Sequence, residues 1–282
     1  MCTVCGCGKS TDNSDLSLEL KGHQNSTHLH YGQGNAKAHI PGMSQARIIR
    51  IERDILGKNA EYAKANRIRF KQQSILALNL VSSPGSGKTT LLVNTVNKLK
   101  HKIPLGVIEG DQQTSYDANK IRETGVSALQ VNTGKGCHLD AQMIENSLDY
   151  FPHLHQGVLF IENVGNLVCP AAFDLGEAHK VVILSTTEGE DKPLKYPDMF
   201  HAADLLIINK IDLLSYVDFN IERCMEYTYR VNPHIDIIKL TGNDKTRLKE
   251  WTDWIENKRQ LVFSSQSGKY ECSVSTQDIG LA

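Results

Sequence analysis

Short apolar runs alternate along the chain with segments in which apolar residues recur every three or four positions. The apolar runs predict buried strands, and the second pattern predicts amphipathic helices. Strands joined by helical connections favour parallel pairing, so the pattern predicts an α/β fold, a mostly parallel sheet with helices on both faces. We expect strands near residues 75–81, 104–109, 128–131, 157–161, 180–185, 204–208 and 235–240.

The same pattern divides the chain into three parts. Residues 43–262 predict a globular domain, whose leading amphipathic helix is capped by Ser44 and runs to about residue 73. Residues 263–282 are low in large apolar residues and predict a disordered tail. Residues 1–42 comprise an N-terminal cysteine cluster and, from residue 9, a polar segment that predicts a flexible tether, either simply solvated or able to hold a divalent metal weakly through its histidines. These histidines are His23, His28, His30 and His39.

A phosphate-binding motif follows the first predicted strand. The pattern GxxxxGK[ST] ends here in Gly87-Lys88-Thr89, and Ser82 stands where the first glycine is expected. Such a turn aims backbone N–H groups at phosphate oxygens, and the helix that follows adds the positive end of its dipole. The lysine is expected to reach the β- and γ-phosphates, and the threonine hydroxyl to ligate Mg²⁺. The predicted cradle comprises Gly85, Ser86, Gly87, Lys88, Thr89 and Thr90.

Two acidic residues lie at the carboxyl ends of later strands, where open α/β sheets assemble their sites. Asp111 is expected either to hold a water bound to Mg²⁺ or position the attacking water, or to cap a helix that begins near Thr114. Glu162 and Gly165 have the form of a switch segment, with an acidic residue facing Mg²⁺ and a glycine N–H near the γ-phosphate. The predicted catalytic set is Lys88, Thr89, Asp111, Glu162 and Gly165.

The sequence Asn209-Lys210-Ile211-Asp212 follows another strand and has the form NKxD. The carboxylate of Asp212 can accept hydrogen bonds from N1–H and the N2 amine of guanine, whereas adenine offers neither donor. A mismatch of this kind discriminates by roughly 10⁴-fold. Lys210 is expected to pack along the base plane and Asn209 to tie the loop to its neighbours. The motif therefore predicts GTP as the bound nucleotide.

Three of the seven cysteines lie within the first seven residues, as Cys2, Cys5 and Cys7. Thiolates select soft or borderline metals, and a turn through Gly6 can bring three sulfurs to one ion. The alternative is a redox CxxC pair, but that motif normally opens a helix in a thioredoxin-like setting, which this region lacks. The cluster is therefore predicted to bind a metal.

A second group of candidate metal ligands follows two strands of the globular domain. Cys137 and His138 come after the third predicted strand, and Cys169 follows the switch segment. We expect them to converge if these two strands are neighbours. A single buried cysteine is usually structural, but three candidate ligands at strand ends favour a metal site on a nucleotide-responsive loop.

Charge and hydropathy exclude two classes of partner. The net charge of −1 gives no indication of a nucleic-acid-binding surface. No apolar run is long enough to span a bilayer and the N-terminus has no apolar signal segment, so we expect a cytoplasmic protein with no membrane partner.

The N-terminal MCTVCGCG, the triplet Gly136-Cys137-His138 and the segment from Glu162 to Pro170 make the chain resemble the HypB family, GTPases that help insert nickel into [NiFe]-hydrogenase. The resemblance covers nearly everything from Ile75 to about Asn257 and implies a SIMIBI-like P-loop GTPase fold. It departs from the usual GTPase pattern at residues 238–242, where a Ser-Ala-Lys-like base loop is expected. The contact with guanine O6 is therefore not assigned.

The resemblance also implies metals, partners and a mechanism. Cys2, Cys5 and Cys7 correspond to a tight nickel site, and Cys137, His138 and Cys169 to a second site for nickel or zinc at the interface of a nucleotide-dependent homodimer. The implied partners are a HypA-type nickel and zinc protein and the hydrogenase large subunit. In this interpretation GTP and Mg²⁺ order the loops around Asp111 and Glu162, and Cys169 moves with its switch. Asn166 stands where many GTPases have glutamine, which implies slow hydrolysis.

Two other interpretations remain open. A urease-type accessory GTPase is disfavoured, because its Cys-Pro-His metal motif is missing and Cys137-His138 stands instead. The third interpretation is a metal store or sensor whose nucleotide site is vestigial.

Overall fold

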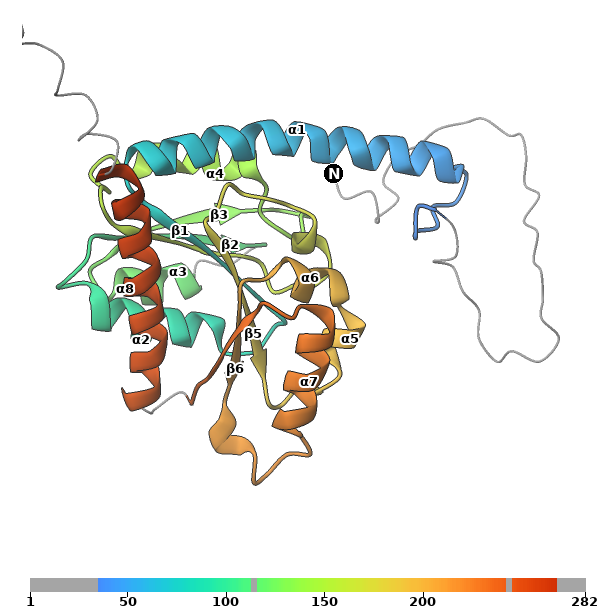
Figure 1. Cartoon of the computed structure of the whole chain (residues 1–282). Coiled ribbons are helices and arrows are strands. Elements are labelled where there is room, and N and C mark those ends of the chain that lie inside the picture. Colours follow the sequence, from blue (N-terminus) through green and yellow to red (C-terminus); the bar gives the residue numbers. More distant parts are fainter. Residues whose placement is uncertain (1–34, 113–115, 242–244, 268–282) are drawn as a thin grey trace, which may run out of the picture. The chain divides into compact units, whose positions relative to one another are not determined.

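The computed structural model describes residues 35–112, 116–241 and 245–267. The chain divides into two compact units, residues 1–59 and residues 60–282. Helix α1 (Gln45–Gln72) runs across this boundary (Figure 1). Its first turn is capped as predicted, because the Ser44 Oγ accepts a hydrogen bond from Arg47 N at 3.4 Å. Gln45 also binds the end of the predicted tether, through hydrogen bonds with Ala36 N and Ala38 O.

The second unit contains one parallel sheet in the described residues, with the strand order β3-β2-β4-β1-β5-β6-β7. Every neighbouring pair is parallel, as the alternation of strands and helices predicted. The strands are β1 (Leu76–Ser82), β2 (Leu105–Asp111), β3 (Ser127–Asn132), β4 (Val158–Glu162), β5 (His179–Ser185), β6 (Leu205–Asn209) and β7 (Asp236–Lys239).

One face of the sheet packs against α2 (Lys88–Leu99), α3 (Tyr116–Arg122) and α8 (Lys245–Ser267). Successive side chains of a strand point to opposite faces, so alternate residues of β1 enter this core. Trp251 on α8 is 1% exposed and donates from Nε1 to the Thr95 Oγ1 on α2 at 2.9 Å. The indole is thus buried with its one donor satisfied.

The other face packs against two groups of helices. The end of α1 and α4 (Ala141–Ser147) cover the β1, β2 and β4 half. Helices α6 (Pro197–Ala202) and α7 (Ile221–Val231) cover β5 and β6, and the short α5 (Lys192–Lys195) precedes them. With helices on both faces, every residue of β1, β4 and β6 is buried.

The prediction that a disordered tail begins at residue 263 is wrong, because helix α8 extends beyond it. It continues to Ser267, so residues 263–267 are helical where disorder was expected. The guanidinium of Arg259 lies over the Phe263 ring at 4.5 Å and donates two hydrogen bonds to the Gln156 carbonyl. Arg259 and Phe263 are one helical turn apart, so their contact stabilises the end of α8.

The carboxyl ends of the strands meet at one edge of the sheet, and β1 lies at the point where the order of connections reverses. Its neighbours are β4 on one side and β5 on the other. Ligand sites of open α/β sheets form at such a point. In the part of the chain that the structure describes, no helix combines the length and the apolar character needed to cross a membrane.

Candidate nucleotide and metal sites

The loop between β1 and α2 has the conformation that a phosphate cradle needs. Gly85 and Gly87 have positive φ values of 78° and 92°, and α2 begins at the next residue, Lys88. A Cβ built on Gly87 would lie 2.6 Å from the Asn209 Nδ2, so glycine is required there for space as well as for φ. The loop therefore presents the N-terminus of α2 at the sheet edge.

The structure explains why a serine, Ser82, can stand at the first position of the motif. Ser82 is the last residue of β1 and is paired with Ile183 on β5, with none of the positive φ that would require glycine. Its side chain is 1% exposed, and the hydroxyl donates to the Ser83 carbonyl at 2.8 Å. A small residue with a satisfied hydroxyl is therefore accommodated at this position.

Four polar side chains meet at the start of α2. The Glu162 Oε1 accepts from the Lys88 Nζ at 2.8 Å and from the Thr89 Oγ1 at 2.6 Å. The same threonine hydroxyl lies 3.1 Å from the Asp117 Oδ2 on α3. The structure thus brings together three of the predicted residues, and it adds Asp117, which the sequence analysis missed.

Glu109 was also missed, and it lies beside Glu162 in register on the neighbouring strand. It is 3% exposed, and the Oε2 atoms of both glutamates have no hydrogen-bond partner among the described residues. Burial, and then repulsion from Glu162 and Asp111, raise the pKa of Glu109 to about 8. The alternation of strand residues could have indicated it, because Glu109 and Asp111 share one face of β2.

Asp111 ends β2 as predicted, at the same edge. Its Oδ1 accepts from Gln112 N at 2.7 Å. Asp111 is the last residue of β2 and the next residue, Gln112, is not helical, so Asp111 is not the N-cap of a helix. The capping alternative is therefore wrong.

We expect Glu109→Gln to stabilise the nucleotide-free, Mg²⁺-free protein at pH 8. In the folded protein Glu109 keeps its proton up to about pH 8, whereas the ordinary value is 4.5. The folded state thus binds more protons between these values, and stability falls as the pH rises through this window. The variant lacks this loss, which is on the order of 3 kcal/mol. Urea unfolding from pH 5.5 to 8.5 measures it.

The exposed Glu123 on the turn after α3 provides the control for this prediction. Glu123→Gln should leave the pH dependence of unfolding as in the parent protein. An unchanged pH slope in Glu109→Gln would show that Glu109 does not titrate in this range.

The NKxD loop is fastened to the phosphate loop. Asn209 Nδ2 donates to the Ser86 carbonyl at 2.9 Å, and Lys210 Nζ donates to the Gly85 carbonyl at 2.7 Å. Thr186 Oγ1 donates to the Lys210 carbonyl at 2.7 Å, which holds Lys210 in its left-handed conformation. Asp212 follows on an exposed turn, with its carboxylate available to a base.

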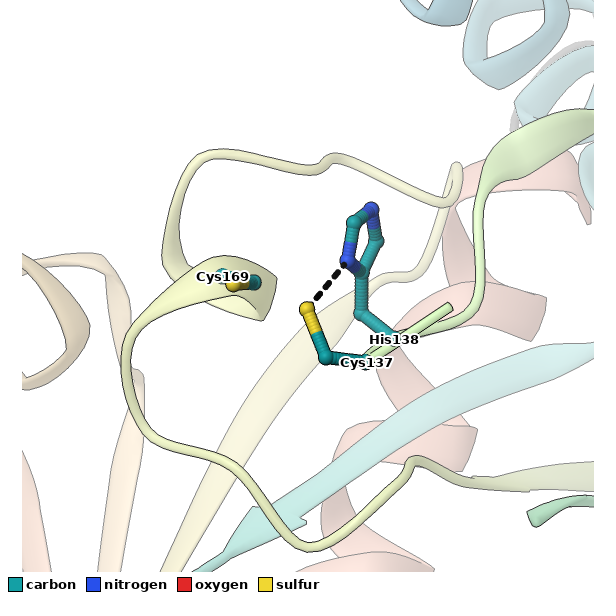
Figure 2. Close-up of side chains that lie close together, drawn as sticks. All are labelled: Cys137, His138 and Cys169. Carbon is teal, nitrogen blue, oxygen red and sulfur yellow. Dashed lines mark hydrogen bonds between the residues drawn. The ribbon is translucent and has the colours of Figure 1, made fainter. Parts of the chain in front are cut away.

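Three candidate metal ligands converge above the ends of β3 and β4. One ligand atom each from Cys137, His138 and Cys169 lies within 4.8 Å of the others (Figure 2). The Cys137 Sγ and His138 Nδ1 are 3.6 Å apart. Metal–sulfur and metal–nitrogen bonds of about 2.3 and 2.0 Å in a tetrahedral shell place such atoms about 3.5 Å apart. The spacing therefore fits one ion with a further coordination position.

The electrostatic environment of His138 also suits a metal ligand. Burial lowers its pKa, which favours the neutral imidazole that binds metals. The ring lies 4.0 Å from that of Phe173, between centroids, and this contact helps to fix its orientation. All three side chains are partly exposed, so the site can be reached from solvent.

The three ligands converge for a different reason from the one predicted. β3 and β4 are not neighbours, because β2 lies between them. The loop after β3 instead crosses the end of β2, where Thr133 N donates to the Asp111 carbonyl at 2.9 Å. It then reaches the end of β4, where Leu139 N donates to the Asn163 Oδ1 at 3.0 Å.

The switch segment contacts both sites. A Cβ on Gly165 would lie 3.1 to 3.3 Å from atoms of Pro84, so the segment packs closely on the phosphate loop. Asn166 Nδ2 donates to the Cys137 carbonyl at 3.3 Å. Cys169 then begins a short 3₁₀ turn, Cys169–Ala171. The other predicted cluster, Cys2, Cys5 and Cys7, lies outside the described residues.

A profile of the nucleotide-binding domain of the CobW/HypB/UreG family matches residues 76–239. The chain is also 55% identical to the hydrogenase maturation factor HypB of Azotobacter vinelandii, over 92% of this chain and 93% of that protein. The chain belongs to the HypB family. The hydrogenase/urease maturation factor HypB of Helicobacter hepaticus is 41% identical, over 77% of this chain and 90% of that protein.

A solved structure of the HypB family has the same fold. The crystal structure of HypB from Helicobacter pylori in complex with nickel superposes with a TM-score of 0.69 at 38% identity. It covers 79% of this chain and all of that one. The resemblance that the motifs indicated is confirmed, and so is the P-loop GTPase fold of the nucleotide-binding domain.

Proposed function

We propose that this HypB-family protein is a GTP-hydrolysing nickel metallochaperone for [NiFe]-hydrogenase maturation, in which the bound nucleotide controls the second metal site. One observation carries the proposal. Glu162 and Gly165 lie at the phosphate loop, and Cys169 lies at the metal triad on the same short segment. If this segment changes conformation when the γ-phosphate is bound or lost, the position of Cys169, one of the three ligands, changes with it.

Mg²⁺ fits the acidic corner at the start of α2. The Thr89 hydroxyl, the carboxylates of Asp117 and Glu162 and the partnerless buried Oε2 atoms supply the oxygen ligands that a hard cation prefers. Bound there with GTP, the ion would neutralise charge on the β- and γ-phosphates. Lys88, whose ammonium pairs with Glu162 in this structure, would then pair with the phosphates instead. Asp111, at the end of the neighbouring strand, is proposed to hold a water molecule bound to this Mg²⁺ ion.

Asp212 selects guanine in this proposal, with Lys210 along the base and Asn209 fixing the loop to the cradle. Nickel or zinc at the triad is cargo, held by Cys137, His138 and Cys169 and released when the switch segment moves. Hydrolysis is expected to be slow, because Asn166 donates to the Cys137 carbonyl and stands where many GTPases have a water-orienting glutamine.

A groove beside the phosphate loop supports a nucleotide-dependent homodimer. It is lined by residues from the loop after β1, from the switch segment, and from α5 and its C-cap, namely Ser83, Pro84, Asn166, Val168, Lys192 and Tyr196. Val168 is 61% exposed, and the aromatic ring of Tyr196 lines the same groove. Large apolar side chains around a groove mark an interaction surface. A second copy placed here would contact the phosphate loop and the segment that carries Cys169.

We expect a non-hydrolysable GTP analogue with Mg²⁺ to convert the protein from monomer to dimer, while GDP does not. Light scattering across a range of protein concentrations measures the change. Val168→Asp should weaken the dimer by about tenfold or more, because a carboxylate would be buried in the interface. Leu261→Asp, at a 63% exposed position on α8, is the matched control. Equal masses with both nucleotides would contradict the proposed dimer.

The N-terminal cysteines are proposed as a separate, tight nickel site. Replacing Cys2, Cys5 and Cys7 together with alanine should abolish this site and leave GTP hydrolysis unchanged, because thiolates are the ligands that it offers. Nickel titration alongside phosphate release measures both. Tight binding that persists in the triple variant would place that site at the histidines or in the nucleotide-binding domain.

The identity of the protein that accepts the nickel distinguishes the remaining interpretations. The proposed recipients are a HypA-type nickel and zinc protein and, directly or through it, the hydrogenase large subunit. The Helicobacter hepaticus relative is named for urease as well as hydrogenase, so a urease-side accessory protein is the comparison partner. Nickel transfer to a HypA-type acceptor in the presence of GTP supports the hydrogenase role. A metal store with a vestigial nucleotide site would transfer nickel equally with GTP, with GDP and without nucleotide.

A further inference from the structure

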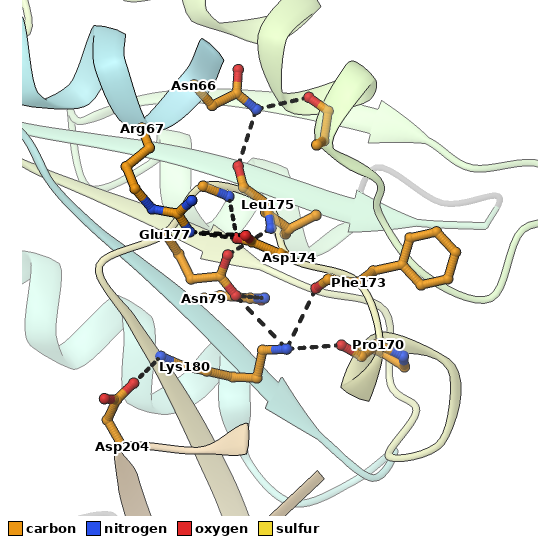
Figure 3. Close-up of polar contacts among 12 residues, drawn as sticks. Asn66, Arg67, Asn79, Pro170, Phe173, Asp174, Leu175, Glu177, Lys180 and Asp204 are labelled. Atoms are coloured by element: carbon orange, nitrogen blue, oxygen red, sulfur yellow. Dashed lines mark hydrogen bonds and ion pairs between the residues drawn. The ribbon is translucent and has the colours of Figure 1, made fainter. Parts of the chain in front are cut away.

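A buried lysine holds the turn that carries Cys169. Lys180, at the start of β5, is 6% exposed, and its ammonium points into the loop after Cys169 (Figure 3). The Nζ donates to the carbonyl of Pro170 at 3.0 Å and lies 3.3 Å from that of Ala171 and 3.4 Å from that of Phe173. The Lys180 ammonium thus lies close to three carbonyls among the four residues that follow Cys169.

The charge of Lys180 is balanced by Glu177, which is itself buried. The Lys180 Nζ and Glu177 Oε1 are 3.8 Å apart. Leu175 N donates to the other carboxylate oxygen of Glu177 at 2.6 Å. Burial raises the pKa of Glu177, while Lys180 and the hydrogen bonds act in the opposite direction. With these partners the charged pair is hydrogen-bonded at both ends, as a buried pair has to be.

Two asparagines continue this network to the switch segment. Asn79, at 0% exposure in β1, donates from Nδ2 to the Glu177 Oε1 at 3.0 Å. Its Oδ1 accepts from the Asn163 Nδ2 at 3.2 Å. Asn163 in turn accepts at Oδ1 from Val164 N and from Leu139 N, each at 3.0 Å. The Leu139 amide directly follows His138, so the network touches the backbone beside two of the three candidate ligands.

We propose that Lys180, Glu177, Asn79 and Asn163 form a buried relay of positioning residues that couples the switch segment to the geometry of the metal triad. This inference rests on the proposed function, since it explains how one loop communicates with the other. The relay crosses β1, the strand that ends in the phosphate cradle, three residues before Ser82. None of its members is a metal or nucleotide ligand.

Such a buried network of hydrogen bonds cannot be deformed gradually. Its donors and acceptors are buried, so a moved Asn163 has either to carry its partners with it or to leave polar groups without hydrogen bonds. The central asparagine uses its amide nitrogen towards Glu177 and its oxygen towards Asn163, and reversing it would lose both bonds. A shift of the Asn163-Val164 turn is therefore transmitted to the Pro170 turn and to the His138-Leu139 peptide.

The test compares the coupling between nucleotide and metal in matched variants. The parent is the full chain with Cys2, Cys5 and Cys7 replaced by alanine, so that the triad is the reporting site. Nickel affinity is measured by the thiolate-to-nickel absorption band, with GDP and with a non-hydrolysable GTP analogue. The ratio of the two dissociation constants is the coupling factor, which we expect to be at least about fivefold in the parent.

Asn79→Leu severs the centre of the relay with a side chain of similar size. We expect its coupling factor to fall to within twofold of one, with nucleotide affinity in the absence of nickel unchanged. Asn66→Leu is the matched control, because Asn66 is 1% exposed and donates to the carbonyls of Ala141 and Leu175 outside the relay. It should lose comparable stability and keep the parent's coupling factor.

A second variant keeps the test valid if Asn79→Leu does not fold. Lys180→Met combined with Glu177→Gln removes both charges together and leaves no buried charge unpaired. We expect it to lose the coupling and to shift the nickel absorption band, since the Cys169 turn is no longer held. Parent-like coupling in either relay variant would overturn the inference, as would an equal loss in Asn66→Leu. A parent without coupling would overturn both the inference and the proposed function.

Discussion

Replacing Asp212 with asparagine is expected to move the preference of the nucleotide site from GTP to xanthosine triphosphate. In the proposed complex the carboxylate accepts from N1–H and the N2 amine of guanine. Asparagine presents an amide N–H to one of these donors, while xanthine has a carbonyl at that place. Sites built around such pairs discriminate by roughly 10⁴-fold. Competition between the two triphosphates in an equilibrium binding titration measures the change.

The same loop offers a control. Asp218 is another exposed aspartate, six residues further along, and it lies in the connection before α7. Asp218→Asn carries the same charge change and should leave the preference for GTP unaltered. Unchanged guanine selectivity in Asp212→Asn would remove this carboxylate from the base site.

Loss of Cys169 is expected to weaken the metal site of the nucleotide-binding domain strongly, because Cys169 is one of its three candidate ligands. Three candidate ligands surround the site, and Cys169→Ala leaves two. Changes to residues that merely support a ligand already cost 10- to 100-fold in metal affinity. We therefore expect a loss on the order of 10²-fold or more. Nickel and zinc titrations of the variant without the N-terminal cysteines measure it.

Cys224 is the matched control for this experiment. It is fully buried in α7 and is not part of the triad, and burial raises the pKa of its thiol to about 12. A thiol of this kind offers no thiolate near neutral pH. Cys224→Ala should bind nickel as tightly as the parent. Metal affinity unaffected by Cys169→Ala would show that the three side chains are neighbours without being a site.

The sequence predicted local features well because their geometry is set within a few residues. The phosphate loop, the cap at Ser44 and the NKxD turn each follow from the spacing of a short motif. The strands β1, β4 and β6 were found because they are buried on both faces and appear as continuous apolar runs. The order of the strands in the sheet depends on packing between distant segments, so the position of β2 between β3 and β4 was not foreseen.

The site residues that the sequence did not predict also depend on packing between distant segments. Asp117 reaches Thr89 because α3 packs next to the start of α2, which no spacing in the sequence reveals. Glu109 was passed over because it was assigned to an apolar strand, although its alternation with Asp111 points to the same face. Lys180 and Glu177 appear in the sequence as ordinary charges three residues apart. Their role depends on burial, which only the folded chain establishes.

The proposed function depends on coupling between the bound nucleotide and the metal triad, and nickel titration of the full chain without the N-terminal cysteines tests this coupling directly. The titration is made with Mg²⁺ and either GDP or a non-hydrolysable GTP analogue. We predict dissociation constants that differ at least about fivefold between the two nucleotides. Identical nickel affinities in the two states would contradict the proposed function.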